Sequence, residues 1–263
     1  MEQPLCCSFF LRIKIKEKED ICFKMKLNKE IKAILFDLDG TLLPMSQAYF
    51  IKQYFKRLAA YGATIGVSTE ALINGTLAGT EAMISNDGKR TNREIFWNTY
   101  FEAVGEKRAD LEELLDKFYF DGFKTLKEFT EDNVLAKKIV KLARGGDRKV
   151  VLATNPVFPM QAQIERLSWI GLSSDDFDLI TSYDNSNYCK PNPQYYIEIC
   201  KAIGVEPENC LMIGNDEGDD MKGASLAGMT CFLVTDHRIM DDNFMWTGAR
   251  GSFEQVLKLI EKL

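Results

Sequence analysis

Short apolar runs that alternate with amphipathic stretches constrain the fold of this chain more than any other feature. The runs cover residues 33–36, 149–153, 178–181, 210–213 and 230–234. Apolar runs of this length are typical of parallel strands that are covered on both faces. Strands that alternate with helices predict an α/β fold. We therefore expect a doubly wound parallel sheet of five strands.

The stretches between the runs carry helical patterns. One helix face is predicted from residues spaced i, i+3, i+4 and i+7, namely Tyr196, Ile199, Cys200 and Ile203. The dipeptide Asn192-Pro193 before them supplies an N-cap and a first-turn proline, which favour a helix start at this point.

The segment 46–130 interrupts this alternation. It has no strand-like run but several helical faces, such as the one formed by Ile51, Tyr54, Phe55 and Leu58. It is also far longer than the dozen or so residues that a crossover between parallel strands needs. We therefore predict an all-helical domain at 46–130, inserted into a Rossmann-like α/β core formed by residues 31–45 and 131–263.

Residues 1–30 differ from the rest of the chain because a brief apolar patch is followed by a dense run of charges. We interpret them as an N-terminal extension. Met25 lies just before the first clear strand, so it is a candidate for the natural start. The alternative is an edge strand at 9–15.

Composition excludes several classes of function. The single histidine, His237, rules out mechanisms that need two or more histidines, and we interpret it as a surface residue. The net charge of −6 disfavours a nucleic acid partner. No apolar run reaches the roughly 18 residues of a membrane span. Seven cysteines without a CxxC pair favour a reducing compartment, so we expect a cytoplasmic protein, whose oligomeric state the sequence does not indicate.

Polar residues follow the predicted strands. They are Asp-Leu-Asp-Gly-Thr at 37–41, Thr-Asn at 154–155, Lys190, and an acidic loop at 214–220. Ligands of open α/β sheets bind beyond the carboxyl ends of the strands, so these residues are expected to converge. Carboxylates there suit a hard cation such as Mg²⁺, whereas hydroxyl, amide and ammonium groups suit phosphate oxygens.

This set resembles the haloacid dehalogenase-like (HAD) hydrolase superfamily, in its phosphatase type with a helical cap inserted between the first and second motifs. The DxDGT signature is present as Asp37-Leu38-Asp39-Gly40-Thr41. Thr154, Lys190 and the acidic loop ending at Asp220 follow in the order of the family. The resemblance covers about residues 31–263.

The resemblance implies three catalytic residues. Asp37 is expected to be the nucleophile that forms an aspartyl-phosphate. Asp39 is expected to protonate the leaving alcohol and then to activate water, which needs a raised pKa. Lys190 is expected to neutralise charge on the nucleophile and on the phosphoryl group.

The resemblance also implies the binding residues. The substrate-binding set is Thr41, Thr154, Asn155 and Lys190, with Thr41 also supporting its loop. The metal set is Asp37, Asp39 through its backbone carbonyl, Asp216 and Asp220. The family most often has aspartate directly after the glycine of the acidic loop, where this chain has Asn215. We therefore expect Asp216 to bind the metal directly and Asp220 to bind it as a second ligand or through water. Asp219 is the spare candidate, interpreted otherwise as a surface or helix-start carboxylate.

The predicted function is a Mg²⁺-dependent phosphatase that hydrolyses a small phosphorylated metabolite. Family dehalogenases lack the second aspartate, so Asp39 disfavours dehalogenation. A phosphomutase of the same fold and a non-catalytic phosphate-binding relative remain alternatives, whereas the motif order argues against a phospho-receiver domain. Sugar phosphates, phosphoglycolate and nucleoside monophosphates all remain open as substrates. The aromatic residues of the cap are interpreted mostly as helix core, with some of them lining the substrate pocket.

Overall fold

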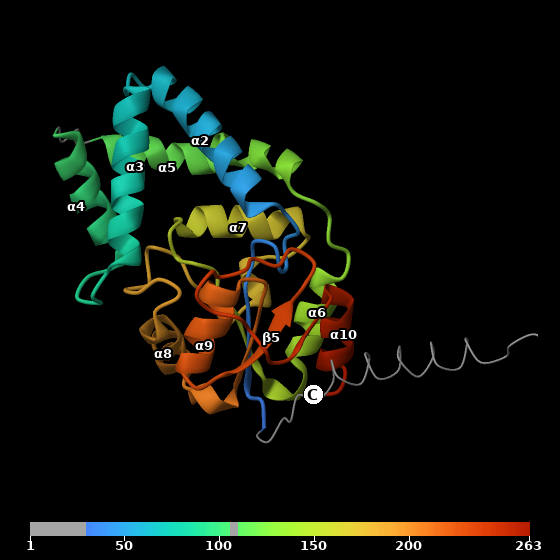
Figure 1. The fold of residues 1–263 in the computed structure, drawn as a ribbon. Helices are drawn as coiled ribbons and strands as arrows, with labels where there is room; N and C mark the ends of the chain where they lie inside the picture. The colour runs from blue at the N-terminus through green and yellow to red at the C-terminus, as the bar shows by residue number, and fades with distance from the viewer. Residues whose placement is uncertain (1–29, 106–109) are drawn as a thin grey trace, which may run out of the picture.

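The computed structural model describes residues 30–105 and 110–263 (Figure 1). Apart from residue 30, the predicted extension, its candidate start at Met25 and the alternative edge strand lie outside the described residues. Among the helices that the structure describes, none has both the length and the apolar character that crossing a membrane requires.

The core of the molecule is a parallel sheet of six strands in the order β3-β2-β1-β4-β5-β6. The strands are β1 Ala33–Phe36, β2 Lys149–Leu152, β3 Leu179–Ile180, β4 Cys210–Gly214, β5 Thr230–Val234 and β6 Arg250–Gly251. The predicted α/β class and parallel sheet are confirmed, with one more strand than expected. Strand β6 was not predicted, because its two residues, Arg250 and Gly251, form no apolar run.

Helices cover both faces of the sheet, as the doubly wound prediction requires. The helices are α6 Ala136–Ala143, α7 Met160–Trp169, α8 Pro193–Ile203, α9 Gly223–Leu226 and α10 Phe253–Ile260. Ile34 and Phe36 of β1 pack with α6, α7 and α10, whereas Ala33 and Leu35 pack with α8 and α9. Successive side chains of a strand point to opposite faces, so the fully apolar run is buried on both sides.

Four short helical turns complete the α/β core. They are η2 Gly145–Asp147, η3 Ser174–Asp176, η4 Pro207–Asn209 and the π-helical turn η5 Glu217–Lys222. The predicted start of α8 is confirmed: Pro193 is its first residue, and the side chain of Asn192 accepts a hydrogen bond from the backbone N of Gln194 at 2.9 Å.

The inserted helical region is also confirmed. It consists of α2 Gln47–Thr64, α3 Thr69–Ile84, α4 Asn92–Val104, α5 Leu111–Asp121 and the 3₁₀ helix η1 Phe123–Phe129, all between β1 and β2. Figure 1 shows α2–α5 together above α7 and the α/β core. The limits of the cap at residues 46 and 130 remain a prediction.

The register of the sheet determines where the site lies. Phe36 at the end of β1 pairs with Leu152 of β2 on one side and with Ile213 of β4 on the other. These three strands therefore end at the same level. The residues that follow them, beginning with Asp37, emerge side by side.

Candidate active site

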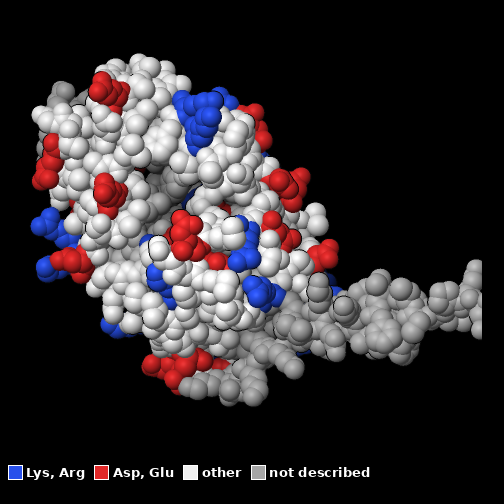
Figure 2. All heavy atoms as spheres, viewed as in Figure 1, with Lys and Arg blue, Asp and Glu red and all other residues white. Residues whose placement is uncertain are grey.

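The ends of the central strands open into a pocket of about 540 Å³. Figure 2 shows the surface hollowed between the helical insert and the α/β core. The predicted site residues that line the pocket are Asp37, Asp39, Thr154, Asn155, Lys190, Asn215, Asp216, Asp219 and Asp220. The structure thus brings together every predicted site residue except Thr41.

Lys190 joins two carboxylates of this pocket. Its Nζ lies 2.8 Å from Oδ1 of Asp37 and 2.6 Å from Oδ1 of Asp220, and 1% of the Lys190 side chain is exposed. Burial by itself lowers the pKa of Lys190, but the two carboxylates outweigh it and hold that pKa well above its ordinary value. Lys190 therefore carries a positive charge next to Asp37.

Asp39 is the second aspartate of the DxDGT segment. Burial raises the pKa of Asp39 from its ordinary value, Arg166 opposes this rise, and the nearby Asp37 adds to it. Its Oδ2 accepts a hydrogen bond from the Arg166 guanidinium, whereas its Oδ1 is buried without a hydrogen-bond partner among the described residues. A raised pKa and an uncommitted oxygen are what a proton donor to a bound ligand needs.

Arg166 is a site residue that the sequence did not reveal. It is fully buried on α7, and its guanidinium lies 4.8 Å from the ring centroid of Phe158. It also donates hydrogen bonds to Gln163 and to the carbonyl of Ala162. The available signal was an arginine on the same helix face as Ala162 and Trp169, because a charge on a buried face is generally paired.

Thr41 lies beneath the pocket rather than in its wall. Its hydroxyl donates to Oδ1 of Asn215 at 3.1 Å, and Nδ2 of Asn215 donates to the carbonyl of His237 at 2.6 Å. Gly40 has φ +86°, and a Cβ there would lie 2.3 Å from Nδ2 of Asn215. The loop after β1 therefore depends on this glycine, and the geometry supports the loop role of Thr41.

Asp216 and Asp220 use their carboxylates differently. Oδ1 of Asp216 accepts hydrogen bonds from the backbone N of Gly218 at 2.8 Å and of Asp219 at 2.9 Å, which caps η5. Asp220 binds Lys190 with Oδ1 and the backbone N of Asp216 with Oδ2 at 3.0 Å. Both oxygens of Asp220 are thus already bonded to protein groups.

Asp219 lies in the first turn of η5, in agreement with its interpretation as a helix-start carboxylate, but it is half-buried and lines the pocket rather than the open surface. Burial raises the pKa of Asp219 to about 6; Lys190 opposes this rise, and the nearby Asp216 and Asp37 add to it. Its Oδ2 accepts a hydrogen bond from Nδ2 of Asn155 at 3.1 Å, and Oδ1 of Asn155 is buried without a partner among the described residues. Asp219 faces the pocket because the π-helical turn η5 directs its side chain inward.

Thr154 is buried at the end of β2. Its backbone carbonyl accepts hydrogen bonds from the Thr181 hydroxyl at 2.7 Å and from the Tyr195 hydroxyl at 2.9 Å. These bonds hold the backbone of Thr154 in place, and its side chain lines the pocket beside Asn155.

A model of the haloacid dehalogenase-like hydrolase family matches residues 31–228. The chain belongs to this family. The motif residues quoted from the sequence lie at the ends of the central strands of this fold.

Curated relatives and solved structures agree with this assignment. The Bacillus subtilis protein YhcW is 29% identical over 209 residues, covering 78% of this chain and 83% of the relative. The glyceraldehyde 3-phosphate phosphatase of Methanothermobacter thermautotrophicus is 27% identical over 206 residues, covering 78% and 85%. The crystal structure of the HAD protein YfnB from Bacillus subtilis, which is bound to magnesium, has a TM-score of 0.54, 18% identity and coverage of 89% and 100%. The last comparison supports the fold of this HAD hydrolase.

The pocket residues fit a hard divalent cation. Asp37, Asp39, Asp216 and Asp219 supply only oxygen donors, which is the ligand type that Mg²⁺ prefers. Within residues 30–105 and 110–263, no three His, Cys, Asp or Glu side chains are already arranged as a metal cluster, and the Lys190 ammonium lies between Asp37 and Asp220. One ammonium faces several carboxylates, so the negative charge that remains favours binding of a cation.

Proposed function

We propose that this HAD hydrolase is a Mg²⁺-dependent phosphatase that works through an aspartyl-phosphate on Asp37. The observation that carries the proposal is the pairing of two carboxylates in one pocket. Asp37 is bonded to a charged lysine, whereas Asp39 has a raised pKa and a free buried oxygen. Two carboxyl groups whose environments differ in this way fit a nucleophile and a proton donor.

In the first step, a carboxylate oxygen of Asp37 attacks phosphorus, and the bond from phosphorus to the ester oxygen breaks. Asp39 gives its proton to the departing alcohol oxygen. In the second step, the Asp39 carboxylate takes a proton from water while the water oxygen attacks phosphorus. Inorganic phosphate leaves and Asp37 is restored. Lys190 reduces the repulsion between Asp37 and the phosphate.

The remaining residues hold phosphate and metal. Thr154 and Asn155 line the pocket and would bind phosphate oxygens. Oδ1 of Asn155, which has no partner among the described residues, would accept a hydrogen bond from a metal-bound water or a protonated group. Asp37, the backbone carbonyl of Asp39 and Asp216 would hold Mg²⁺, which would offset the repulsion between carboxylate and phosphate. Because both oxygens of Asp220 are engaged, we assign it to positioning Lys190 rather than to direct metal binding.

The names of the relatives support the substrate class. They include a glyceraldehyde 3-phosphate phosphatase and, in Thermotoga maritima, a phosphorylated carbohydrates phosphatase that is 23% identical over 212 residues. Gln47 and Ile51 of α2 line one side of the pocket, and a helical insert beside the site suits a small phosphate monoester, because a lid excludes large substrates and bulk water.

The test is hydrolysis of p-nitrophenyl phosphate with Mg²⁺. We expect Asp37→Asn to abolish turnover, whereas the exposed control Asp242→Asn should keep it. Chelation of Mg²⁺ should stop the reaction, and addition of the metal should restore it. Turnover that survives Asp37→Asn would falsify the assignment of the nucleophile, and one bound phosphate per chain without turnover would indicate a phosphate acceptor rather than a phosphatase.

A further inference from the structure

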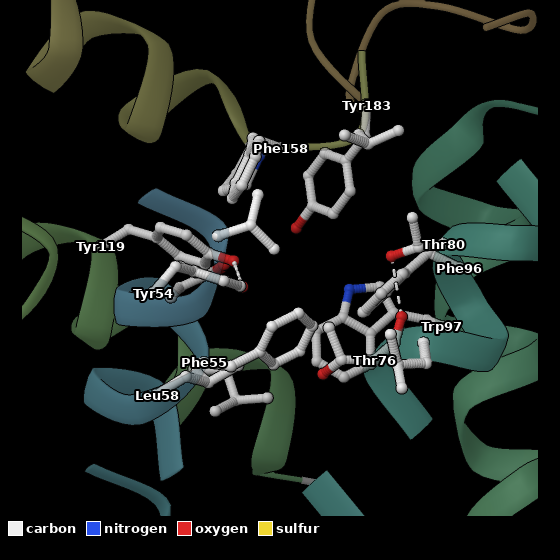
Figure 3. A pocket seen from close by; sticks show the side chains of 16 residues that line it. Tyr54, Phe55, Leu58, Thr76, Thr80, Phe96, Trp97, Tyr119, Phe158 and Tyr183 are labelled. Atoms are coloured by element: carbon white, nitrogen blue, oxygen red, sulfur yellow. Dashed lines mark hydrogen bonds between the residues drawn. The ribbon is translucent and has the colours of Figure 1, made fainter. Parts of the chain in front are cut away.

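A second pocket lies next to the catalytic one, at the junction of the helical insert and the core. It measures about 860 Å³ up to its mouth, and Figure 3 shows the aromatic side chains that surround it. Three residues, Ile51, Val157 and Phe158, line both pockets. These shared side chains place the two pockets directly next to each other. We call the second one the aromatic pocket.

We propose that the aromatic pocket binds the leaving group, and that the substrate is a phosphate monoester whose alcohol carries an aromatic ring or an apolar group of similar size. This inference rests on the proposed phosphatase function. It narrows the substrate class that the motifs leave open.

The walls of the aromatic pocket are almost entirely apolar. Leu58, Leu115 and Pro159 lie among the rings of Tyr54, Phe55, Phe96, Trp97, Tyr119, Phe158 and Tyr183. Burial of an aromatic ring against such walls is favourable in proportion to the apolar area removed from water.

The polar groups of these walls are largely used within the protein. The hydroxyls of Tyr54 and Tyr119 bond to each other at 2.9 Å. The hydroxyl of Thr76 donates to the carbonyl of Leu72 at 2.7 Å, and that of Thr80 donates to the carbonyl of Thr76 at 2.8 Å. A sugar would lose the water on its hydroxyls and gain few partners here, which costs free energy.

Three polar groups of the pocket remain available to a ligand. One is the carboxylate of Asp116, whose Oδ2 lies 3.6 Å from Nη2 of Arg93. A second is Nε1 of Trp97, which is buried and has no hydrogen-bond partner among the described residues. The Trp97 residue as a whole is 7% exposed. Figure 3 shows the Tyr183 hydroxyl pointing into the same space. These groups can bind one polar atom at the edge of a mainly apolar ligand, such as a ring substituent.

The position of the aromatic pocket fits the direction of the leaving group. Phe158 stacks against the Arg166 guanidinium, which in turn binds Asp39, the proposed proton donor to the alcohol oxygen. An alcohol that receives its proton from Asp39 therefore lies close to Phe158. Its carbon chain can then continue past Phe158 into the pocket.

The experiment compares three esters of primary alcohols: 2-phenylethyl phosphate, ethyl phosphate and glycerol 1-phosphate. Their leaving groups have similar acidity, so differences in kcat/KM report on binding of the alcohol. We expect the phenylethyl ester to exceed the ethyl ester by about 10- to 100-fold, which is the range for burial of one large apolar group. The kcat/KM for glycerol 1-phosphate should not exceed that for ethyl phosphate.

Thr80→Phe would fill the aromatic pocket and should reduce the phenylethyl-to-ethyl ratio by about tenfold or more. Thr69→Phe, at an exposed position of the same helix, is the matched control and should keep the ratio. As a measurement that needs no variant, 2-phenylethanol should inhibit the wild-type enzyme and glycerol should not.

The outcomes separate this inference from the proposed function. Equal kcat/KM values for the phenylethyl and ethyl esters, with hydrolysis that depends on Asp37, would overturn the aromatic pocket and leave the phosphatase in place. A ratio that survives Thr80→Phe in a folded protein would also overturn it. Asp37-dependent hydrolysis of p-nitrophenyl phosphate without hydrolysis of the phenylethyl ester would overturn the aromatic pocket alone. Absence of turnover with all four esters would overturn the proposed function as well.

Discussion

Arg166 and Asp39 form a buried ion pair between α7 and the loop after β1, with side chains that are 0% and 14% exposed. The guanidinium is held by four neighbours, because it also stacks on Phe158 and donates to Gln163 and to the carbonyl of Ala162. Only Oδ2 of Asp39 is used in this pair. Arg166 thus fixes the carboxyl group through Oδ2 and leaves Oδ1 without a hydrogen-bond partner in the described part of the chain.

We predict that Arg166→Leu lowers kcat by about 100-fold, in line with the contribution of a positioned general acid, and changes KM much less. Arg166→Lys should restore part of the lost kcat, because it keeps the charge but not the fork of donors. Steady-state kinetics on folded variants, checked by circular dichroism, measure this effect, and Arg57→Leu on the cap surface is the control. An unchanged kcat in folded Arg166→Leu would refute the positioning role.

Sequence patterns were sufficient to predict that the residues following the strands lie together. Asp37, Thr154 and Asn215 each come directly after a buried apolar run, and parallel strands bring their carboxyl ends to one edge. Arg166 could not be found in this way, since its contact with Asp39 spans 127 positions and depends on how α7 packs. Long-range packing of helices leaves little trace in local periodicity.

The acidic loop shows a second limit of sequence reasoning. The backbone N of Met221 donates to the carbonyl of Asp216 at 3.1 Å, an i to i+5 bond that widens the turn. The four-residue spacing of Asp216 and Asp220, which the family also uses, favoured these two residues and left Asp219 as the spare candidate. In the widened turn, Asp219 also faces the pocket, and Asp220 turns toward Lys190.

The different roles of Asp219 and Asp220 predict different effects on stability. Asp220→Asn should lower the free energy of unfolding by about 1.5–3 kcal/mol, the range for a hydrogen bond to a charged group, because an amide cannot satisfy both Lys190 and the backbone N of Asp216. Asp219→Asn should cost less, since one bond to Asn155 is at stake. Urea unfolding without metal measures both values. A larger loss for Asp219→Asn would contradict this division.

Asp216 is predicted to bind the metal directly. Asparagine is as good an N-cap as aspartate, so Asp216→Asn should keep η5 while it removes one negative charge from the pocket. We expect the Mg²⁺ concentration for half-maximal activity to rise about tenfold or more, with little change in thermal stability without metal. Titration of activity with Mg²⁺ measures the shift, and an unchanged requirement would exclude Asp216 as a ligand.

Because α3 packs closely on α4, we predict that a single methyl group added between them destabilises the protein. A Cβ at Gly75 would lie 2.5 Å from the ring of Tyr100, which is fully buried. Gly75→Ala should therefore destabilise the protein by about 1–3 kcal/mol despite the higher helix propensity of alanine. Asn74→Ala, at an exposed position of the same helix, should stabilise it slightly. Denaturant unfolding measures the change in the free energy of unfolding for both variants. A stabilising Gly75→Ala would show that α3 and α4 can move apart at little cost.

Asp178, before β3, predicts how stability depends on pH. Burial tends to raise the pKa of Asp178, but the backbone N of Val150 at 2.8 Å, Lys149 at 3.1 Å and Arg144 together hold it below the ordinary value of 3.8. A depressed pKa means that the unfolded chain binds the proton first as pH falls. The stabilisation is thus complete above about pH 4 and is lost as pH falls through the folded pKa.

Asp178→Asn should remove this pH-dependent part of the stability. We expect the variant to be less stable than wild type by about 1 kcal/mol at pH 6, and the difference to shrink toward pH 3 because the wild-type carboxylate is then protonated. Asp132→Asn, an exposed carboxylate in the loop before α6, should show no such convergence. The free energy of unfolding in urea, measured at intervals from about pH 3 to 6, tests the sign. A difference that grows as pH falls would mean that Asp178 is stabilised in its neutral form, and the ion pairs with Lys149 and Arg144 would then not be what holds this edge of the sheet.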